Sequence, residues 1–264
     1  MHPVLFEING FAVSSYYFIN ILGAAAGFFV LFLNTRKYKK NIRMRIFLLV
    51  FAVFAVFIAG ASAGAKIEEL AGGGSIPRAG RIIPQFSLWW GFLAALLSLF
   101  PVASMLKLGA WEAADLAAPS VAMGGIFAKI GCLMYGCCFG IPCPPDAAAS
   151  FFPEQSPAGG IFPDRALYPV QIYEALSWAF IFIALVLLKR VKTFRGELVV
   201  VEGILYSVLR FFLEFIRYHE TARFPSAAQI WSVLFFIAGI ILLFMLPALK
   251  AGKHSRQGIF SSRP

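Results

Sequence analysis

Residues 206–217 read Tyr-Ser-Val-Leu-Arg-Phe-Phe-Leu-Glu-Phe-Ile-Arg. The stretch is apolar enough for a membrane-spanning helix, although it contains Tyr206, Arg210, Glu214 and Arg217. On a helix with about 100° per residue, offsets of 4, 8 and 11 residues place these four side chains within roughly 80° of one another. The stretch therefore predicts a helix with one polar stripe and otherwise apolar faces.

The polar stripe has two interpretations. A charged group near the centre of a bilayer costs about 2.5–3.5 kcal/mol on insertion scales, so it needs a compensating role. One interpretation is a structural ion pair between Arg210 and Glu214 that pins two helices together. The other is the cationic wall of a lipid-headgroup site, because a guanidinium donates two hydrogen bonds to a phosphate. His219, one turn beyond the stripe, is the histidine best placed to act as a general base.

The composition indicates a polytopic membrane protein. Of the 264 residues, 60% are hydrophobic and only 14% are charged, and the mean hydropathy is +0.79, whereas a soluble domain is about 45–50% apolar and about 25% charged. These values exclude a soluble globular enzyme, a disordered chain and a small disulfide scaffold. The apolar runs are long and continuous, which favours helices over the short alternating strands of a barrel. We expect an all-α bundle of seven transmembrane helices, at residues 12–33, 46–65, 86–106, 113–135, 170–188, 198–216 and 228–248.

Lysine and arginine in the loops predict the orientation, because basic residues concentrate on the cytoplasmic side. The loops at 34–45, 106–112 and 189–197, together with the C-terminal tail, hold 15 basic residues, and the opposite side holds 6. The N-terminus is therefore expected outside and the C-terminus in the cytoplasm. The net charge of +10 comes largely from these loops, so we expect the lipid bilayer as a partner and no nucleic acid.

The chain is expected to form one membrane-embedded domain over residues 1–264. Its outer loops, at about 66–85 and 137–168, are rich in glycine and proline and predict irregular backbone. Because the inner loops are short and basic, a working site is expected near the outer face. The sequence contains no internal repeat, which argues against a transporter with matching halves.

A second polar group opens the fifth expected span, where residues 168–174 read Tyr-Pro-Val-Gln-Ile-Tyr-Glu. Pro169 suits the start of a helix, and the helix dipole favours a carboxylate such as Glu174 in the first turn. Capping is therefore one interpretation of Glu174. The other is a polar pocket at the membrane edge, formed with Gln171 and Tyr173.

A third group ends the fourth expected span, where residues 129–140 read Lys-Ile-Gly-Cys-Leu-Met-Tyr-Gly-Cys-Cys-Phe-Gly. Lys129 lies deep enough to need a partner or a cavity, unless it snorkels to the surface. The four cysteines of the chain are Cys132, Cys137, Cys138 and Cys143. Their spacing matches no standard zinc pattern, so we expect no metal and no cofactor. Small packing residues, or a disulfide such as Cys138 with Cys143, are the alternatives.

These segments together resemble the prolipoprotein diacylglyceryl transferase family, integral enzymes of the bacterial inner membrane. The resemblance covers nearly the whole length, from Pro3 to about Leu243. Residues 206–217 are similar to the family's Tyr-Gly-x-x-Arg-x-x-x-Glu-x-x-Arg pattern, and residues 168–174 to its His-Pro-Ser/Thr-Gln-Leu-Tyr-Glu motif.

Three further segments carry the resemblance. Ser15-Tyr16 is similar to the family's tyrosine-containing opening. Residues 115–140 are similar to its signature segment, including Lys129-Ile130-Gly131 and Gly136. Gln229 matches the glutamine that opens the family's last span.

The resemblance implies a transferase of lipoprotein biosynthesis. The diacylglyceryl group of phosphatidylglycerol would pass to the thiol of a lipobox cysteine in a secreted prolipoprotein, and glycerol phosphate would leave. By the same resemblance, Arg210 holds the phosphate as the main catalytic group, with Tyr206 and Glu214 orienting it. The expected substrate-binding residues are Lys129, Tyr16, Gly136, Gln171, Tyr173, Glu174 and Arg217.

The chain departs from the family pattern within the chemistry and keeps the scaffold. The departures are Lys129 for an arginine, Cys132 for an asparagine, Cys137 for a glutamate, Trp89-Trp90-Gly91 for a His-Gly-Gly or Tyr-Gly-Gly motif, and Tyr168 for a histidine. A lysine keeps the charge of an arginine but loses its bidentate fork. Two alternatives therefore stay open: a divergent paralogue that binds or modifies a lipid or thiol substrate by another route, and a non-enzymatic membrane protein.

Overall fold

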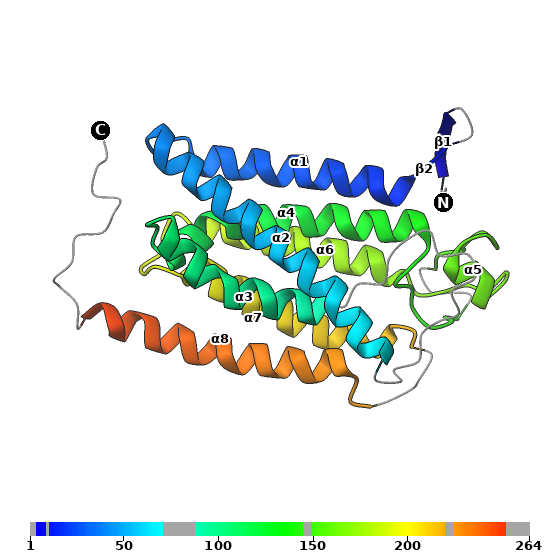
Figure 1. Cartoon of the computed structure of the whole chain (residues 1–264). Coiled ribbons are helices and arrows are strands. Elements are labelled where there is room, and N and C mark those ends of the chain that lie inside the picture. Colours follow the sequence, from blue (N-terminus) through cyan, green and yellow to red (C-terminus); the bar gives the residue numbers. More distant parts are fainter. Residues whose placement is uncertain (1–3, 9–10, 71–87, 145–148, 220–223, 252–264) are drawn as a thin grey trace. The chain divides into compact units, whose positions relative to one another are not determined.

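The computed structural model describes residues 4–8, 11–70, 88–144, 149–219 and 224–251. Helices make up most of these residues (Figure 1), so the prediction of a helical protein is confirmed. The helices are α1 (Ser15–Thr35), α2 (Lys40–Leu70), α3 (Leu88–Met105), α4 (Ala110–Tyr135), α5 (Pro157–Ile161), α6 (Val170–Leu188), α7 (Glu197–Leu213) and α8 (Ala227–Ala251), with a 3-10 turn at Glu214–Ile216. A short antiparallel hairpin of β1 (Val4–Ile8) and β2 (Phe11–Ser14) precedes them, which the all-α prediction did not include.

Five helices in the described part of the chain are long and apolar enough to cross a membrane. They are α1, α2, α4, α6 and α8. The other two expected spans correspond to α3, which is apolar but shorter, and to α7, which has 17 residues and contains charged side chains. Seven crossings and the orientation of the termini therefore stay predictions.

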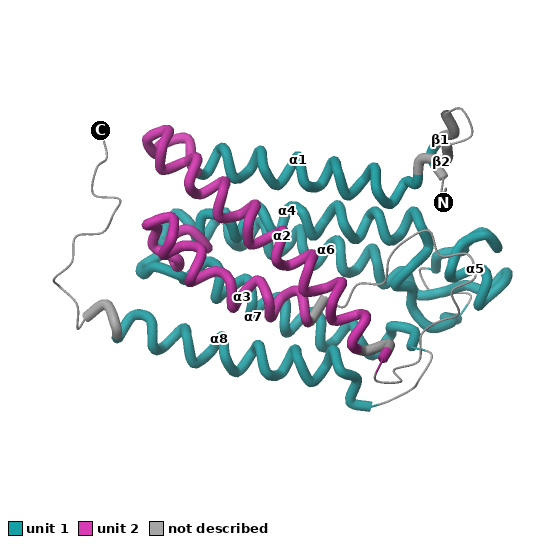
Figure 2. The backbone as a smooth tube through the Cα atoms, in the orientation of Figure 1, with its two compact units in different colours: residues 1–34, 115–254 teal, residues 35–114, 255–264 magenta. Residues whose placement is uncertain are grey.

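The chain divides into two compact units (Figure 2), and the first contains the candidate site. This unit comprises residues 1–34 and 115–254, which hold α1, most of α4, α6, α7 and α8. Its core cluster joins α4, α6 and the start of α7 through Ala118, Ala122, Trp178, Ile181, Leu185 and Leu198. Close packing also joins α1 to α4, because a Cβ added at Gly27 would lie 3.0 Å from the carbonyl oxygen of Ser120.

The second unit comprises residues 35–114 and 255–264. Its described core is the pair α2 and α3, where a Cβ at Gly60 would lie 2.5 Å from the Cβ of Ala94. Helix α2 continues to Leu70, so the expected outer loop at 66–85 was wrong in its first residues. The rest of that loop, residues 71–85, lies outside the described residues.

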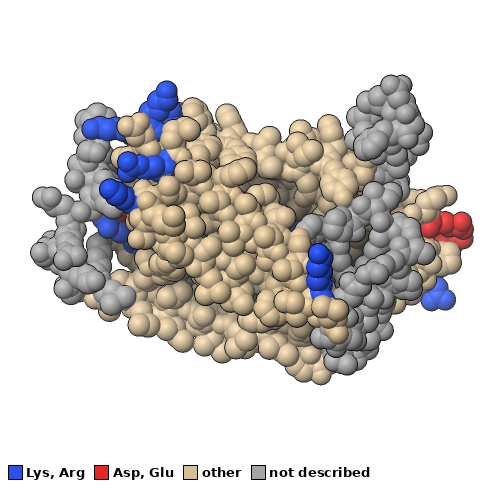
Figure 3. All heavy atoms as spheres, viewed as in Figure 1, with Lys and Arg blue, Asp and Glu red and all other residues tan. Residues whose placement is uncertain are grey.

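The surface is apolar in the manner expected for contact with lipid tails. Large hydrophobic side chains point outward along the spans, including Phe29 at 62% exposure, Leu97 at 67% and Phe244 at 74%. On the face drawn in Figure 3, the middle carries few charged side chains. A soluble protein rarely exposes contiguous apolar surface on this scale.

A buried carboxylate on α4 holds the start of α7 in place. Asp115 is 2% exposed, and its oxygens accept hydrogen bonds from the backbone N–H groups of Gly196 (2.7 Å), Leu198 (2.9 Å) and Val199 (3.2 Å). The ammonium of Lys192 donates a fourth bond at 2.9 Å. These N–H groups belong to the first turn of α7, where a carboxylate satisfies otherwise unpaired donors and the helix dipole favours negative charge. Asp115 therefore fixes the start of α7 against α4.

The segment between α4 and α6 is more ordered than the expected irregular loop at 137–168. It contains the short helix α5 and the bridged pairs Gly140 with Arg217, Pro142 with Leu167, and Ser150 with Leu167. Residues 145–148 lie outside the described part. The pairing with Arg217 is important, because it ties this segment to the end of α7.

Candidate active site

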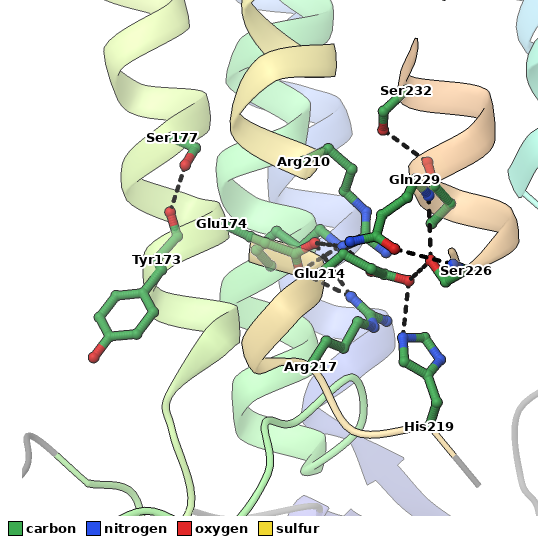
Figure 4. A network of polar contacts seen from close by, with 12 residues as sticks. Tyr173, Glu174, Ser177, Arg210, Glu214, Arg217, His219, Ser226, Gln229 and Ser232 are labelled. Atoms are coloured by element: carbon green, nitrogen blue, oxygen red, sulfur yellow. Dashed lines mark hydrogen bonds and ion pairs between the residues drawn. The ribbon is translucent and has the colours of Figure 1, made fainter. Parts of the chain in front are cut away.

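The candidate site centres on the carboxylate of Glu174, on the second turn of α6 (Figure 4). Glu174 is 3% exposed. Three cations from separate segments lie near it: Lys129 Nζ at 2.8 Å, Arg217 Nη1 at 3.2 Å and Arg210 Nη1 at 3.7 Å. The structure thus brings together four residues that the sequence placed in three different motifs.

A second carboxylate, Glu214, holds the other side of Arg210. The Nη1 atom of Arg210 lies 2.6 Å from Glu214 Oε2, in the (i, i+4) relation expected for one helical turn. The hydroxyl of Ser226 donates to Glu214 Oε1 at 2.8 Å, and His219 Nε2 lies 2.8 Å from the same oxygen. Arg210 therefore lies between two buried carboxylates on α6 and at the end of α7.

The end of α7 differs from the straight helix expected over residues 198–216. The α-helix stops at Leu213, and a 3-10 turn over Glu214–Ile216 leads to Arg217 in an extended conformation (φ −85°, ψ 140°). Arg217 is therefore not on the helical stripe, and that part of the prediction was wrong. Its guanidinium reaches Glu174 because the extended backbone pairs with Gly140.

Some polar atoms of the site have hydrogen-bonding capacity that the protein itself does not use. The contact between Arg210 Nη1 and Glu214 Oε2 is close, but neither atom has a hydrogen-bond partner of good geometry. Gln171 Oε1 is also buried without a partner. Buried polar groups are normally paired, so these atoms are available to hydrogen-bond a bound polar group.

Gln171 connects the charged cluster to the cysteine segment after α4. Its Nε2 donates to the carbonyl oxygen of Cys137 at 2.8 Å. Gly136, an expected site residue, has φ +81°, which favours glycine, and a Cβ there would lie 2.7 Å from the Cβ of Ser156. The role of Gly136 in the structure is thus to turn the chain at the end of α4.

The four cysteines are free thiols, so the suggested disulfide of Cys138 with Cys143 is not present. Hydrogen bonds from the thiols of Cys132 and Cys137 lower the pKa of Cys138 well below its ordinary value. The positive charges of Arg217 and Lys129 act in the same direction, while burial opposes them. Arg217 and Lys129 thus lie close enough to Cys138 to act on it electrostatically.

The three tyrosines expected in the site have different positions. Tyr16 lies beside the end of α4, with its ring centroid 6.0 Å from that of Tyr135. The ring of Tyr206 stacks on Trp178 at 4.7 Å, one helical turn before Arg210. Tyr173 points away from the charged cluster (Figure 4), because consecutive residues of a helix are about 100° apart.

Two apolar grooves border the charged cluster. One, of about 220 Å³, lies between α4 and α6 and is lined by residues that include Ile130, Leu133 and Gln171. The other, of about 230 Å³, lies between α7 and α8 and is lined by residues that include Phe211, Gln229 and Leu234. Each groove is thus lined by one glutamine, Gln171 or Gln229, and otherwise by apolar side chains.

Ser226 was not singled out from the sequence, although a local signal was present. The stretch Ser226-Ala227-Ala228-Gln229 has the spacing of a capping box at a helix start. In the structure the Gln229 N–H donates to Ser226 Oγ at 3.2 Å, and the Ser226 N–H donates to Gln229 Oε1 at 3.0 Å. The same hydroxyl contacts Glu214, so the cap of α8 is also part of the charged cluster.

Comparison with known proteins supports the resemblance found in the sequence. The family model described as prolipoprotein diacylglyceryl transferase matches residues 3–245. A phosphatidylglycerol–prolipoprotein diacylglyceryl transferase of Campylobacter lari is 37% identical over 151 residues, which cover 54% of this chain and 51% of that relative. The chain therefore matches about half the length of that relative.

Two clostridial relatives, also named phosphatidylglycerol–prolipoprotein diacylglyceryl transferases, match over more of their length. The Clostridium tetani protein is 25% identical over 92% of this chain and 96% of its own. A Clostridium perfringens protein is 28% identical over 98% of this chain and 99% of its own. Because the family model matches nearly the whole of this chain, the chain belongs to the prolipoprotein diacylglyceryl transferase family.

Proposed function

We propose that this protein transfers the diacylglyceryl group of phosphatidylglycerol to the thiol of a lipobox cysteine in a prolipoprotein. The observation that carries the proposal is the convergence of Lys129, Arg210 and Arg217 on Glu174. With Glu214 included, three cations face two carboxylates, which leaves one positive charge uncompensated. A phosphodiester carries a negative charge, so this excess positive charge would attract its headgroup.

Arg210 is the proposed catalytic group. When a thiolate attacks the glycerol carbon, the bond from that carbon to the phosphate oxygen breaks and negative charge grows on the departing glycerol phosphate. A guanidinium held in advance in a buried site stabilises this charge in the transition state. Glu214 and Glu174 hold Arg210 from two sides, and the stacking of Tyr206 on Trp178 stiffens the turn of α7 before it.

Lys129, Arg217 and Gln171 are proposed to bind the headgroup, with Tyr16 at the same end of α4. The apolar grooves beside Gln171 and Gln229 suit the acyl chains of the lipid, because apart from these glutamines the grooves are lined by apolar side chains. We propose further that the protein lies in the bacterial inner membrane as seven spans, with this site near the outer face.

The direct test is an assay of the purified full chain with phosphatidylglycerol and a synthetic lipobox peptide. We expect release of glycerol phosphate together with lipidated peptide, and no release with a peptide in which serine replaces the cysteine. Arg210→Ala should lower the rate at least about 100-fold, as does the loss of one oxyanion-stabilising group in other enzymes. The matched control is Arg165→Ala, which removes an exposed arginine of the segment between α4 and α6. A folded wild-type protein that releases no glycerol phosphate would overturn the proposed function.

A further inference from the structure

Three thiols come together directly beside the charged cluster. The Sγ atoms of Cys132, Cys137 and Cys138 all lie within 4.8 Å of one another. Cys132 is buried, and the other two are partly exposed. Cys143, the fourth cysteine, is not a member of this group.

The end of α4 explains why the thiols meet. The N–H of Cys137 donates to the carbonyl of Cys132 at 3.1 Å, and the N–H of Gly136 donates to that of Leu133 at 3.2 Å. These two bonds, with Gly136 in the left-handed conformation, form a Schellman motif, in which the chain folds back over the last turn of the helix. A Schellman motif usually brings two apolar side chains together at these positions. Here it brings together the side chains of Cys132 and Cys137.

The backbone of Cys138 adopts an energetically unfavourable conformation. Its φ is +61°, a left-handed conformation that is unfavourable for a residue with a Cβ. Strained conformations of this kind persist where the surrounding structure fixes them, and they cluster at functional sites. The amide of Gln171 also holds the adjoining carbonyl of Cys137, so the third thiol is fixed next to the other two.

The sequence spacing of the cysteines led us to expect no metal, but the three thiols meet in space. We propose that Cys132, Cys137 and Cys138 bind one zinc ion and leave its fourth position for the lipobox thiol. This inference rests on the proposed function and adds a means of activating the nucleophile. Three protein ligands with one open position are typical of catalytic zinc sites, and thiolates are preferred zinc ligands.

The geometry suits this metal. Zinc–sulfur bonds of about 2.3 Å put the sulfurs of a tetrahedral site about 3.8 Å apart, so three sulfurs within 4.8 Å need only a small inward movement. Three thiolates and a zinc ion carry one net negative charge. Lys129 and Arg217 both interact electrostatically with Cys138, and they would stabilise that charge.

The lipobox thiol binds zinc and gives up its proton, because a thiol that coordinates zinc is deprotonated. The thiolate sulfur forms a bond to the glycerol carbon, and the bond from that carbon to the phosphate oxygen breaks. The electron pair leaves with glycerol phosphate, which accepts the released proton from solvent. The product is a neutral thioether, a weaker zinc ligand, and it can be replaced by the next thiol.

The test uses cobalt(II) as a spectroscopic probe in the full-length, reduced, chelator-treated protein. We expect one equivalent of cobalt to give the sulfur-to-cobalt charge-transfer bands of a tetrahedral thiolate site, and zinc to bleach them. Cys132→Ser, Cys137→Ser and Cys138→Ser should each weaken binding at least about 100-fold, since even outer-shell changes cost 10–100-fold. Cys143→Ser is the matched control and should bind as the wild type does. Adding the lipobox peptide should shift the spectrum, and the serine peptide should not.

The outcomes separate this inference from the proposed function. Thiolate bands without any glycerol phosphate release would keep the zinc site and overturn the transferase. Release that continues after chelation and in a folded Cys138→Ser variant would keep the transferase and overturn the zinc site. Cobalt bands that survive all three single substitutions, or that need Cys143, would also overturn it. Thermal unfolding of each variant in detergent identifies any variant that fails to fold.

Discussion

Two of the buried carboxylates in the first unit invite comparison, Asp115 near the start of α4 and Glu174 near the start of α6. They are 2% and 3% exposed, yet their surroundings differ. Asp115 accepts three hydrogen bonds from backbone N–H groups around the start of α7 and one from Lys192. Glu174 faces three cationic side chains from different segments. The carboxylate of Asp115 is satisfied mainly by the backbone and fixes a helix, whereas the cations gathered at Glu174 form the proposed headgroup site.

The largest loss of activity is expected for Glu174→Gln. The substitution leaves Lys129, Arg210 and Arg217 close together with less negative charge between them. Removing one partner of a buried ion pair costs about 3–5 kcal/mol, and Arg210 should move from its catalytic position. We expect transfer activity to fall at least about 100-fold and the melting temperature in detergent to fall as well.

Two controls accompany this variant. Glu154→Gln removes an exposed glutamate between α4 and α6 and should change neither activity nor melting temperature. If Glu174→Gln kept wild-type activity while melting earlier, Glu174 would be a purely structural residue like Asp115, and the comparison would fail.

Asp115→Asn tests the other side of the comparison. The amide keeps the volume but loses the charge, and its NH₂ group cannot accept from the N–H groups of α7. Hydrogen bonds to charged groups contribute about 1.5–3 kcal/mol each, so we expect a loss of about 3 kcal/mol in the free energy of unfolding. Activity per folded molecule should stay within about twofold of wild type. A selective loss of activity at unchanged stability would contradict the structural role.

The helices were predictable from the sequence wherever an apolar run was long and uninterrupted. The span expected at 170–188 coincides with α6, and that at 113–135 ends with α4. The end of α7 was not predictable from periodicity, because its change to a 3-10 turn accompanies a tertiary pairing of Arg217 with Gly140. The N-terminal hairpin was missed because its second strand belongs to an apolar run that continues into α1.

The site was predictable where it depends on one helix. The contact of Arg210 with Glu214 follows from their four-residue spacing. The role of Glu174 was open, because capping and a pocket both fitted its place near a helix start, and only tertiary contacts distinguish them. The glycine after Tyr135 is a typical helix stop. It could have indicated that the chain folds back there and brings Cys137 near Cys132.

A smaller effect is expected for Gln171→Leu, which removes the hydrogen bond that links the charged cluster to the cysteine segment. Leucine fills a similar volume but cannot donate to the Cys137 carbonyl, which would be left without this partner. An unpaired buried group costs about 1–3 kcal/mol. We expect a roughly tenfold fall in activity and faster alkylation of Cys137 and Cys138 by a maleimide. Gln171→Met, which also lacks the donor and adds no charge, should behave similarly, and unchanged alkylation in both variants would refute the link.

The smallest expected effect is that of Ser226→Ala, which separates a helix cap from a contact in the site. The variant removes the acceptor for the Gln229 N–H and the hydroxyl that donates to Glu214. Loss of an N-cap costs about 1 kcal/mol, and Glu214 keeps Arg210 and His219 as partners. Because these partners remain, we expect only a small fall in melting temperature and a two- to fivefold fall in activity. Ser232→Ala is the matched control, because that hydroxyl only donates back to the Ala228 carbonyl within α8, which adds little to helix stability. Equal effects of the two variants would mean that the hydroxyl of Ser226 does not contribute to the site through Glu214.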